Sequence, residues 1–121
     1  MAQSEWDLAH AREDLERGYY EWACFSAQQA AEKAVKAVLQ RWGGEPWGHS
    51  ITQLLGAVRA RETVADDLVV AAKQMDKAYG APRYPNAHQT GTPHEQYNLI
   101  EAERLIAYAS RILRFCKGLL A

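Results

Sequence analysis

Apolar residues recur at intervals of three and four along nearly every long segment of the chain. Strict alternation of apolar and polar residues never lasts more than a few positions. The first spacing places residues on one face of a helix, whereas the second would be needed for half-buried strands. The pattern therefore predicts an all-α fold.

Two helices are expected in the first third of the chain. The first runs from about residue 4 to residue 17, with Ser4 as a plausible cap and Gly18 as its end. The second and longest runs from about Tyr20 to Trp42 and stops at the glycine pair 43–44. Small residues line one face of this helix, which implies that another helix packs closely against it. These residues are Ala23, Ala27, Ala30, Ala31 and Ala34.

Three more helices are expected, of which the first is short and capped by Ser50. The next begins near Thr63, because Thr63 and Asp66 have the spacing of a capping box, and it ends at Gly80. The last helix has two possible starts, Thr92 and Asn98, each three residues before a glutamate. We favour Asn98 because the sustained helical period follows it.

Length and composition indicate a single domain over residues 1–121, since 121 residues with 48% hydrophobic content suffice for one core. No basic segment followed by an apolar run and no apolar run of about 18 residues is present, so we expect a cytoplasmic protein without a membrane span.

Cys24 and Cys116 lie within helical patterns and are expected to be buried thiols. A net charge of −1 excludes a general nucleic-acid binder but permits a local basic site.

Candidate chemistry concentrates in the segment from about Gly80 to Tyr97, which is long for a connection in a compact domain. Arg83 and His88 lie there, outside any apolar face. Arginine binds phosphate through paired hydrogen bonds, and histidine exchanges a proton near neutral pH. The two residues are therefore candidates for phosphodiester chemistry without a metal, although an ordinary surface loop is the simpler interpretation.

Aromatic side chains surround this pair. Tyr79 and Tyr84 could stack a nucleobase, or they could pack the segment onto the helices. On the second helix Glu32, Lys33 and Lys36 form a polar side that is either solvated or lines a cleft with the segment. Glu32 and Lys36 are in the right order for an ion pair one helical turn apart. His49 precedes the cap at Ser50, and we interpret it as a structural residue.

Motifs of the commoner enzyme classes are missing from the sequence. The four histidines form no HExxH motif, and no glutamate is followed three residues later by a histidine. We expect neither a metal site nor a cofactor. There is also no glycine-rich phosphate loop and no nucleophile elbow.

The second helix resembles that of a known family. The segment from Trp22 to Ala37, with its run Gln-Gln-Ala-Ala-Glu-Lys-Ala, is similar to the HEPN family, the higher eukaryote and prokaryote nucleotide-binding domain. His49–Ser50, the leucine pair 54–55, Tyr79 and the run 83–85 follow in the family's order. The resemblance covers almost the whole chain.

This resemblance implies an antiparallel up-and-down bundle of four helices with an additional short helix. It also implies a homodimer that binds nucleotide or RNA and is one half of a toxin–antitoxin system with a minimal nucleotidyltransferase. Family members that are toxins are metal-independent endoribonucleases with an arginine, four to six residues and a histidine. Arg83 and His88 match that spacing. By analogy Arg83 would hold the scissile phosphate, and His88 would activate the ribose 2′-hydroxyl or protonate the leaving oxygen.

Three functions are compatible with these residues. Noncatalytic binding of nucleotide or RNA is favoured, because Tyr84–Pro85 stands where the nuclease pattern has a small polar residue, and because the pair lies well before Asn98. The candidate binding residues are Tyr79, Tyr84, Glu32, Lys33 and Lys36. A metal-independent endoribonuclease with Arg83 and His88 as catalytic residues is the first alternative. A noncatalytic helical assembly subunit is the second.

Overall fold

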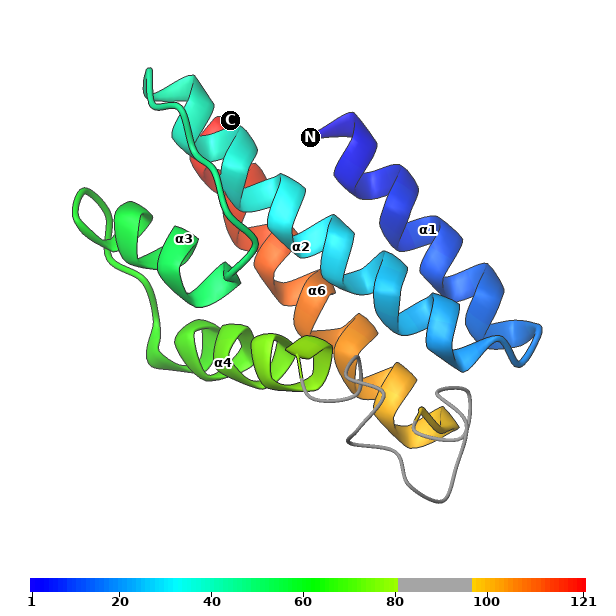
Figure 1. Ribbon diagram of the computed structural model, residues 1–121. Coiled ribbons are helices and arrows are strands. Elements are labelled where there is room, and N and C mark those ends of the chain that lie inside the picture. The colour runs from blue at the N-terminus through cyan, green and yellow to red at the C-terminus, as the bar shows by residue number, and fades with distance from the viewer. Residues whose placement is uncertain (81–96) are drawn as a thin grey trace.

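The computed structural model describes residues 1–80 and 97–121, with residues 79 and 80 described by their backbone alone. Every regular element in those ranges is helical, as Figure 1 shows. The all-α prediction is therefore confirmed. The helices are α1 (Ala2–Glu16), α2 (Tyr20–Arg41), α3 (Ile51–Arg59), α4 (Asp66–Gly80) and α6 (Leu99–Leu120).

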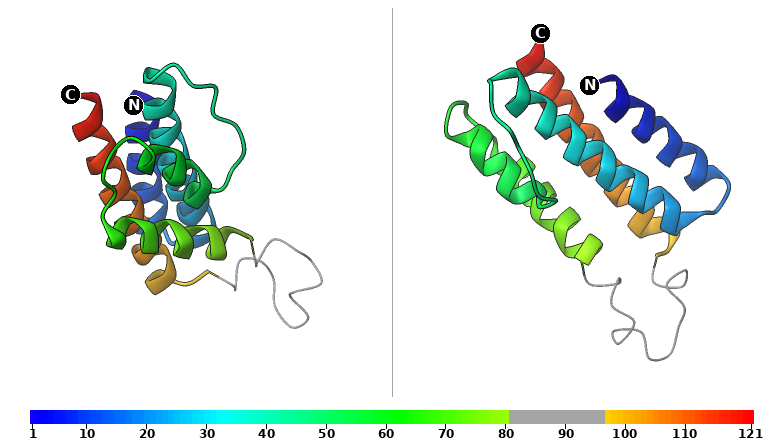
Figure 2. Two further views of the ribbon diagram at one scale, coloured as in Figure 1. Left: turned by 90° about the vertical axis from the view of Figure 1, so that its left-hand side faces the viewer. Right: turned by 45° about the horizontal axis from the view of Figure 1, so that its top comes forward.

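The longest helices form the centre of the bundle. α2 packs most extensively against α6 and α1. The short α3 packs against α2 and α4, and α4 also packs against α6. Figure 2 shows α2 and α6 running in the same direction and α1 the opposite way, with α4 crossing them obliquely in the direction of α1. The chain is thus an up-and-down bundle of four main helices, to which α3 is added.

Two glycines end α1 and α2 in the same manner. Gly18 has a φ of 79° and Gly43 a φ of 88°, which is the left-handed region that favours glycine. After α2 the Gly43 N–H donates to the carbonyl of Gln40 and the Gly44 N–H donates to the carbonyl of Leu39, both at 2.9 Å. The paired bonds satisfy carbonyls at the helix end and turn the chain sharply. Both helix ends lie where the sequence predicts them.

Of the four predicted helix caps, two are confirmed and two are wrong. Ser50 caps α3 by accepting from the Gln53 N–H at 3.2 Å, and Asn98 caps α6 in the same way through the Glu101 N–H at 2.8 Å. Ser4 caps nothing, because α1 begins at Ala2 and the Ser4 side chain is buried. Thr63 is not the cap of α4 either, because the first intrahelical bonds of that helix go to the carbonyl of Ala65.

The core is formed by small side chains on α2 and larger ones on its neighbours. The five alanines of the predicted face are all fully buried. Opposite them α6 buries Leu105, Ile112 and Leu113. Alanine adds no bulk beyond its methyl group, so helix backbones can approach closely along such a face. The prediction that another helix packs against this face is confirmed.

Both cysteines contribute to this core as free thiols. Burial, together with a smaller effect of the charge of Glu101, raises the pKa of Cys24 to about 12. Burial alone raises the pKa of Cys116 to about 12. The two thiols are therefore protonated near neutral pH and behave as small apolar groups. None of the described helices combines the length and the apolar character needed to cross a membrane.

Candidate functional site

A buried carboxylate lies in the middle of α2, on the side that faces α3. Glu32 is 5% exposed, although glutamate is almost never buried unless it is paired. Its carboxylate accepts a hydrogen bond from the Lys36 ammonium at 3.1 Å. The two residues are one helical turn apart, in the order that favours such a pair. Sequence predicts this pair correctly, but it does not indicate that the carboxylate is buried.

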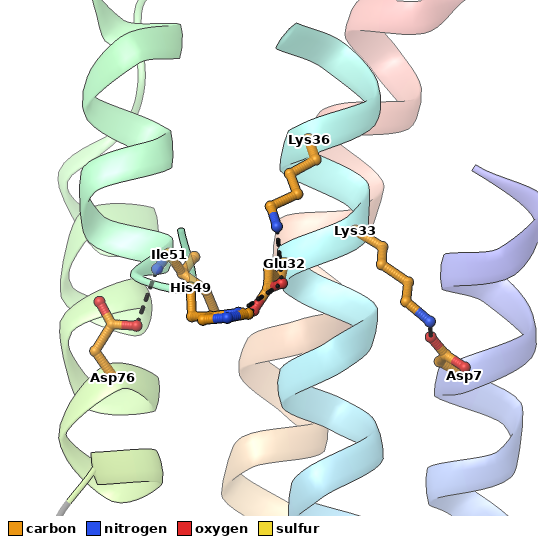
Figure 3. A network of polar contacts seen from close by, with 7 residues as sticks. All are labelled: Asp7, Glu32, Lys33, Lys36, His49, Ile51 and Asp76. Atoms are coloured by element: carbon orange, nitrogen blue, oxygen red, sulfur yellow. Dashed lines mark hydrogen bonds and ion pairs between the residues drawn. The ribbon is translucent and has the colours of Figure 1, made fainter. Parts of the chain in front are cut away.

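The second partner of this carboxylate is His49, from the connection before α3. Its Nδ1 lies 3.2 Å from Oε1 of Glu32 and 3.3 Å from Oε2, as Figure 3 shows. The His49 side chain is 76% exposed, whereas that of Glu32 is 7% exposed. One nitrogen of the ring is thus held against the carboxylate, while most of the side chain faces solvent.

The position of His49 depends on how the N-terminus of α3 is fixed. Asp76 of α4 accepts hydrogen bonds from the Ile51 N–H at 2.9 Å, the Thr52 N–H at 3.0 Å and the Ser50 hydroxyl at 3.0 Å. A carboxylate at this end of a helix satisfies N–H groups that have no intrahelical partner and opposes the helix dipole. Asp76 therefore joins α4 to the start of α3, next to His49.

Lys33 has a different partner from its neighbours on α2. Its ammonium lies 2.9 Å from Oδ2 of Asp7, a buried carboxylate on α1 that also accepts a hydrogen bond from Gln3 at 3.0 Å. In Figure 3 the Lys33 side chain extends toward α1, whereas Lys36 and His49 both contact Glu32, His49 from the α3 side. The three polar residues of the predicted site thus divide between two clusters.

The remaining candidate residues are not placed. Arg83, Tyr84 and His88 lie outside the described residues. Tyr79 lies in the last turn of α4, three residues after Asp76, and its side chain is likewise outside the described part of the chain. Within residues 1–80 and 97–121 no group of three His, Cys, Asp or Glu side chains is arranged to hold a metal ion.

Sequence reasoning missed the role of two carboxylates and gave His49 a purely structural role. Asp76 is far in the chain from the start of α3, and Asp7 is far from Lys33, so these roles become visible only once the helices are packed. A weak signal did exist for His49. It directly precedes a capped helix start, and Glu32 stands among alanines that the pattern places on a buried face.

Comparisons with known proteins agree with this architecture. The HEPN domain family matches residues 1–119. A Methanocaldococcus jannaschii protein that carries the name "Putative toxin MJ1304" is 27% identical over 129 residues, which cover 99% of this chain and 85% of that protein.

Solved structures match more closely. The crystal structure of TT1696 from Thermus thermophilus superposes with a TM-score of 0.91 at 43% identity, covering 98% of this chain and 93% of that one. A crystal structure of a HEPN domain protein from Thermotoga maritima gives a TM-score of 0.79 at 49% identity, with 97% and 92% covered.

Proposed function

Because this chain belongs to the HEPN domain family, we propose that it binds nucleotide or RNA as one half of a two-component system whose other half is a nucleotidyltransferase-type protein. The observation that carries this proposal is the family match over residues 1–119, which includes α2 and the segment with Arg83 and His88. We expect the protein to act in the cytoplasm and to bind its ligand without a cofactor.

The proposed site combines the Arg83–His88 segment with polar residues of the described helices. Arg83 would bind a phosphate through paired hydrogen bonds, and Tyr79 and Tyr84 would stack on a base. The cluster of Glu32, Lys36 and His49 supports this location, because Asp76 of α4 binds the start of α3, directly after His49, and the segment follows α4 in the sequence. Lys33, which is paired with Asp7, is the least favourable of the proposed ligand contacts.

A catalytic alternative is favoured by the name of one relative, which describes that protein as a toxin. In this alternative His88 would take the proton of a ribose 2′-hydroxyl or supply one to the leaving oxygen. Arg83 would stabilise the negative charge that develops on the phosphate oxygens. The reaction would be metal-independent cleavage of RNA.

Dimer formation is part of the proposal, because two facing copies would bring two Arg83–His88 segments to one ligand and double the local positive charge. Large apolar rings on the surface support it. Trp6 is 61% exposed and Trp22 is 60% exposed, and such rings are enriched at protein interfaces. The noncatalytic assembly subunit would use the same rings without binding a ligand.

One set of samples tests these functions together. Purified protein in chelator is mixed with single-stranded RNA, and both binding and cleavage are followed for wild type, Arg83→Ala, His88→Ala and the matched control His94→Ala. We expect Arg83→Ala to weaken binding about tenfold or more, as for loss of a charge-assisted contact, with little change in the control. Cleavage that disappears in His88→Ala would establish the nuclease alternative. Equal binding by all four proteins would refute the proposed site.

A further inference from the structure

A cavity of about 390 Å³ opens between α1 and α6. Its most buried lining residues are apolar, Leu8 at 7% and Leu113 at 3% exposure, and the other side chains that line it are polar or charged. Cavities that bind small molecules enclose about 300–1,000 Å³ and combine apolar walls with a few polar groups. This cavity is therefore large enough for a small ligand, and none of its residues belongs to the site proposed above.

Two arginines from different helices line this one space, Arg12 of α1 and Arg114 of α6. Within residues 1–80 and 97–121 neither guanidinium has a hydrogen-bond or ion-pair partner. Each carries five N–H donors in a rigid fork and stays charged at neutral pH. Ser110, which adds a hydroxyl, lines the same cavity. The fold thus gathers two unused guanidinium groups and a hydroxyl around one space.

The carboxylates closest to the cavity are already matched. Glu5 is the acidic residue in the lining, and it lies 3.2 Å from the ammonium of Lys117, which also lines the cavity, so these two charges offset each other. The buried carboxylates of Asp7 and Asp14 face other partners, on α2 and on α1 itself. The positive charge of the two arginines therefore remains, and it depends on no group that titrates near neutral pH.

Acidic residues outside the lining leave these arginines unoccupied. Glu13 and Glu16 are close to Arg12 in the sequence, yet neither forms an ion pair with it in the described part of the chain. On α6 the nearest acidic residue in the sequence, Glu103, lies about 10 Å along the helix before the first lining residue. From residue 110 to its end α6 carries three basic residues and no acidic one. The α6 side of the cavity is therefore basic.

A phosphate monoester suits these donors better than other common anions. It presents three free oxygens and carries a charge of about −1.5 to −2 at neutral pH. A carboxylate has two oxygens, which a single arginine can occupy through paired hydrogen bonds. A phosphate within an RNA backbone is a diester with two free oxygens and one charge. Two arginines and a hydroxyl therefore match the monoester.

We propose that the cavity between α1 and α6 binds a small phosphate monoester, with the phosphate between Arg12 and Arg114 and an apolar or aromatic body against Leu8 and Leu113. Ser110 donates a further hydrogen bond to the phosphate. A mononucleotide carries such a group, and so does a phosphorylated aromatic compound without a sugar. The ligand is bound without any bond being made or broken, and the inference goes beyond RNA binding at the Arg83–His88 segment.

The test follows the methyl groups of Leu8 and Leu113 by NMR while ligands are added to the full chain. AMP and phenyl phosphate are the two monoesters, and adenosine is the matched compound without phosphate. We expect saturable methyl shifts with a monoester and none with adenosine. Tighter binding of AMP identifies a nucleotide site, and tighter binding of phenyl phosphate identifies a site for other monoesters. No saturable shift with either monoester, or equal shifts with adenosine, would overturn the proposal.

The chain offers a matched control on α6 itself. Arg12→Gln and Arg114→Gln should each weaken monoester binding about tenfold, as expected for loss of a charge-assisted hydrogen bond. Arg111→Gln removes the same charge three residues away, from an arginine that lies 6.0 Å from the ring centre of Tyr108 and outside the lining. Because water and salt screen such a charge, its effect should be less than about twofold. Equal losses in Arg114→Gln and Arg111→Gln would show that binding follows net charge alone, which overturns the site.

A second substitution separates donor geometry from charge. Arg114→Lys keeps the charge but replaces the planar fork by a single ammonium, so it should also weaken binding. Unchanged affinity in this variant would contradict the paired hydrogen bonds. All of these side chains are exposed, so the circular dichroism spectrum of each variant should match that of wild type.

This experiment and the RNA assay can fail separately, because the methyl groups of Leu8 and Leu113 report on this cavity. Monoester shifts that persist in a protein with no affinity for RNA refute the proposed function and keep the cavity site. RNA binding that depends on Arg83, without monoester shifts at these leucines, refutes the cavity site alone.

Discussion

Replacing Asp76 by alanine should destabilise the fold more than any single surface change on α4. This carboxylate accepts three hydrogen bonds, from the backbone of Ile51 and Thr52 and from the hydroxyl of Ser50. Asp76→Ala removes all three and leaves the N–H groups at the start of α3 without these partners. It also detaches α4 from the connection that carries His49.

The size of the effect follows from those contacts. Loss of a helix cap costs about 1 kcal/mol, and a hydrogen bond to a charged group contributes about 1.5–3 kcal/mol. The three bonds share one carboxylate that is only half-buried, so they are not additive and water partly replaces them. We therefore expect a loss of about 2–4 kcal/mol. In a domain of this size that lowers Tm by about 8–16 °C.

Urea unfolding followed by circular dichroism measures this loss, with Lys73→Ala as the control on the exposed side of the same helix. The control should change the free energy of unfolding by less than about 0.5 kcal/mol. Ser50→Ala should lie between the two, at about 1 kcal/mol, because it removes the cap but leaves the backbone bonds to Asp76. If Asp76→Ala and Lys73→Ala unfold at the same urea concentration, Asp76 does not hold α3.

Three further predictions follow from the core and its ion pairs. Ala30→Leu should lower the free energy of unfolding in urea by about 1–3 kcal/mol, because the larger side chain forces α2 and the helices that pack on it apart. An unchanged urea midpoint would show instead that this face is not closely packed. The raised pKa values of the two buried cysteines mean that folding favours their protonated form, so stability should be intact below about pH 9 and fall as the pH rises toward 12. Urea midpoints between pH 8 and 10.5 measure that loss. Replacement of Cys116 by alanine should make the midpoint fall less steeply with pH, and a fall as steep as in wild type would contradict a contribution of Cys116. Lys33→Ala should lower the free energy of unfolding by about 1–3 kcal/mol, because it leaves the buried Asp7 without its cation. The control Lys117→Ala, at an exposed pair, should lower it by less than about 0.5 kcal/mol. Similar thermal midpoints for the two variants would contradict this prediction.

The fold was largely predictable because its signals are local. Alanine spacing on α2, the glycines that end α1 and α2, and the cap at Asn98 each act within a few residues. The two wrong starts have a common cause, since tertiary burial overrides capping propensity. Ser4 is buried within α1, and Val64 occupies the core immediately before α4 begins.

The site was less predictable because its contacts join distant parts of the chain. The pair of Glu32 and Lys36 could be recognised from helical spacing, whereas the contact of His49 with the same carboxylate spans 17 residues. The bonds of Asp76 to α3 span 24 to 26 residues and have no sequence signature. Arg83, Tyr84 and His88 stay predictions, as does their role in binding.

Cross-linking to RNA tests the central claim most directly, because it identifies the residues that contact the ligand. Single-stranded RNA containing 4-thiouridine is irradiated with the purified protein, and the modified peptides are identified by mass spectrometry. The account predicts cross-links to Tyr79 or Tyr84 that are lost when Arg83→Ala abolishes binding. Cross-links confined to α1 and the C-terminal half of α6, unchanged in that variant, would contradict it.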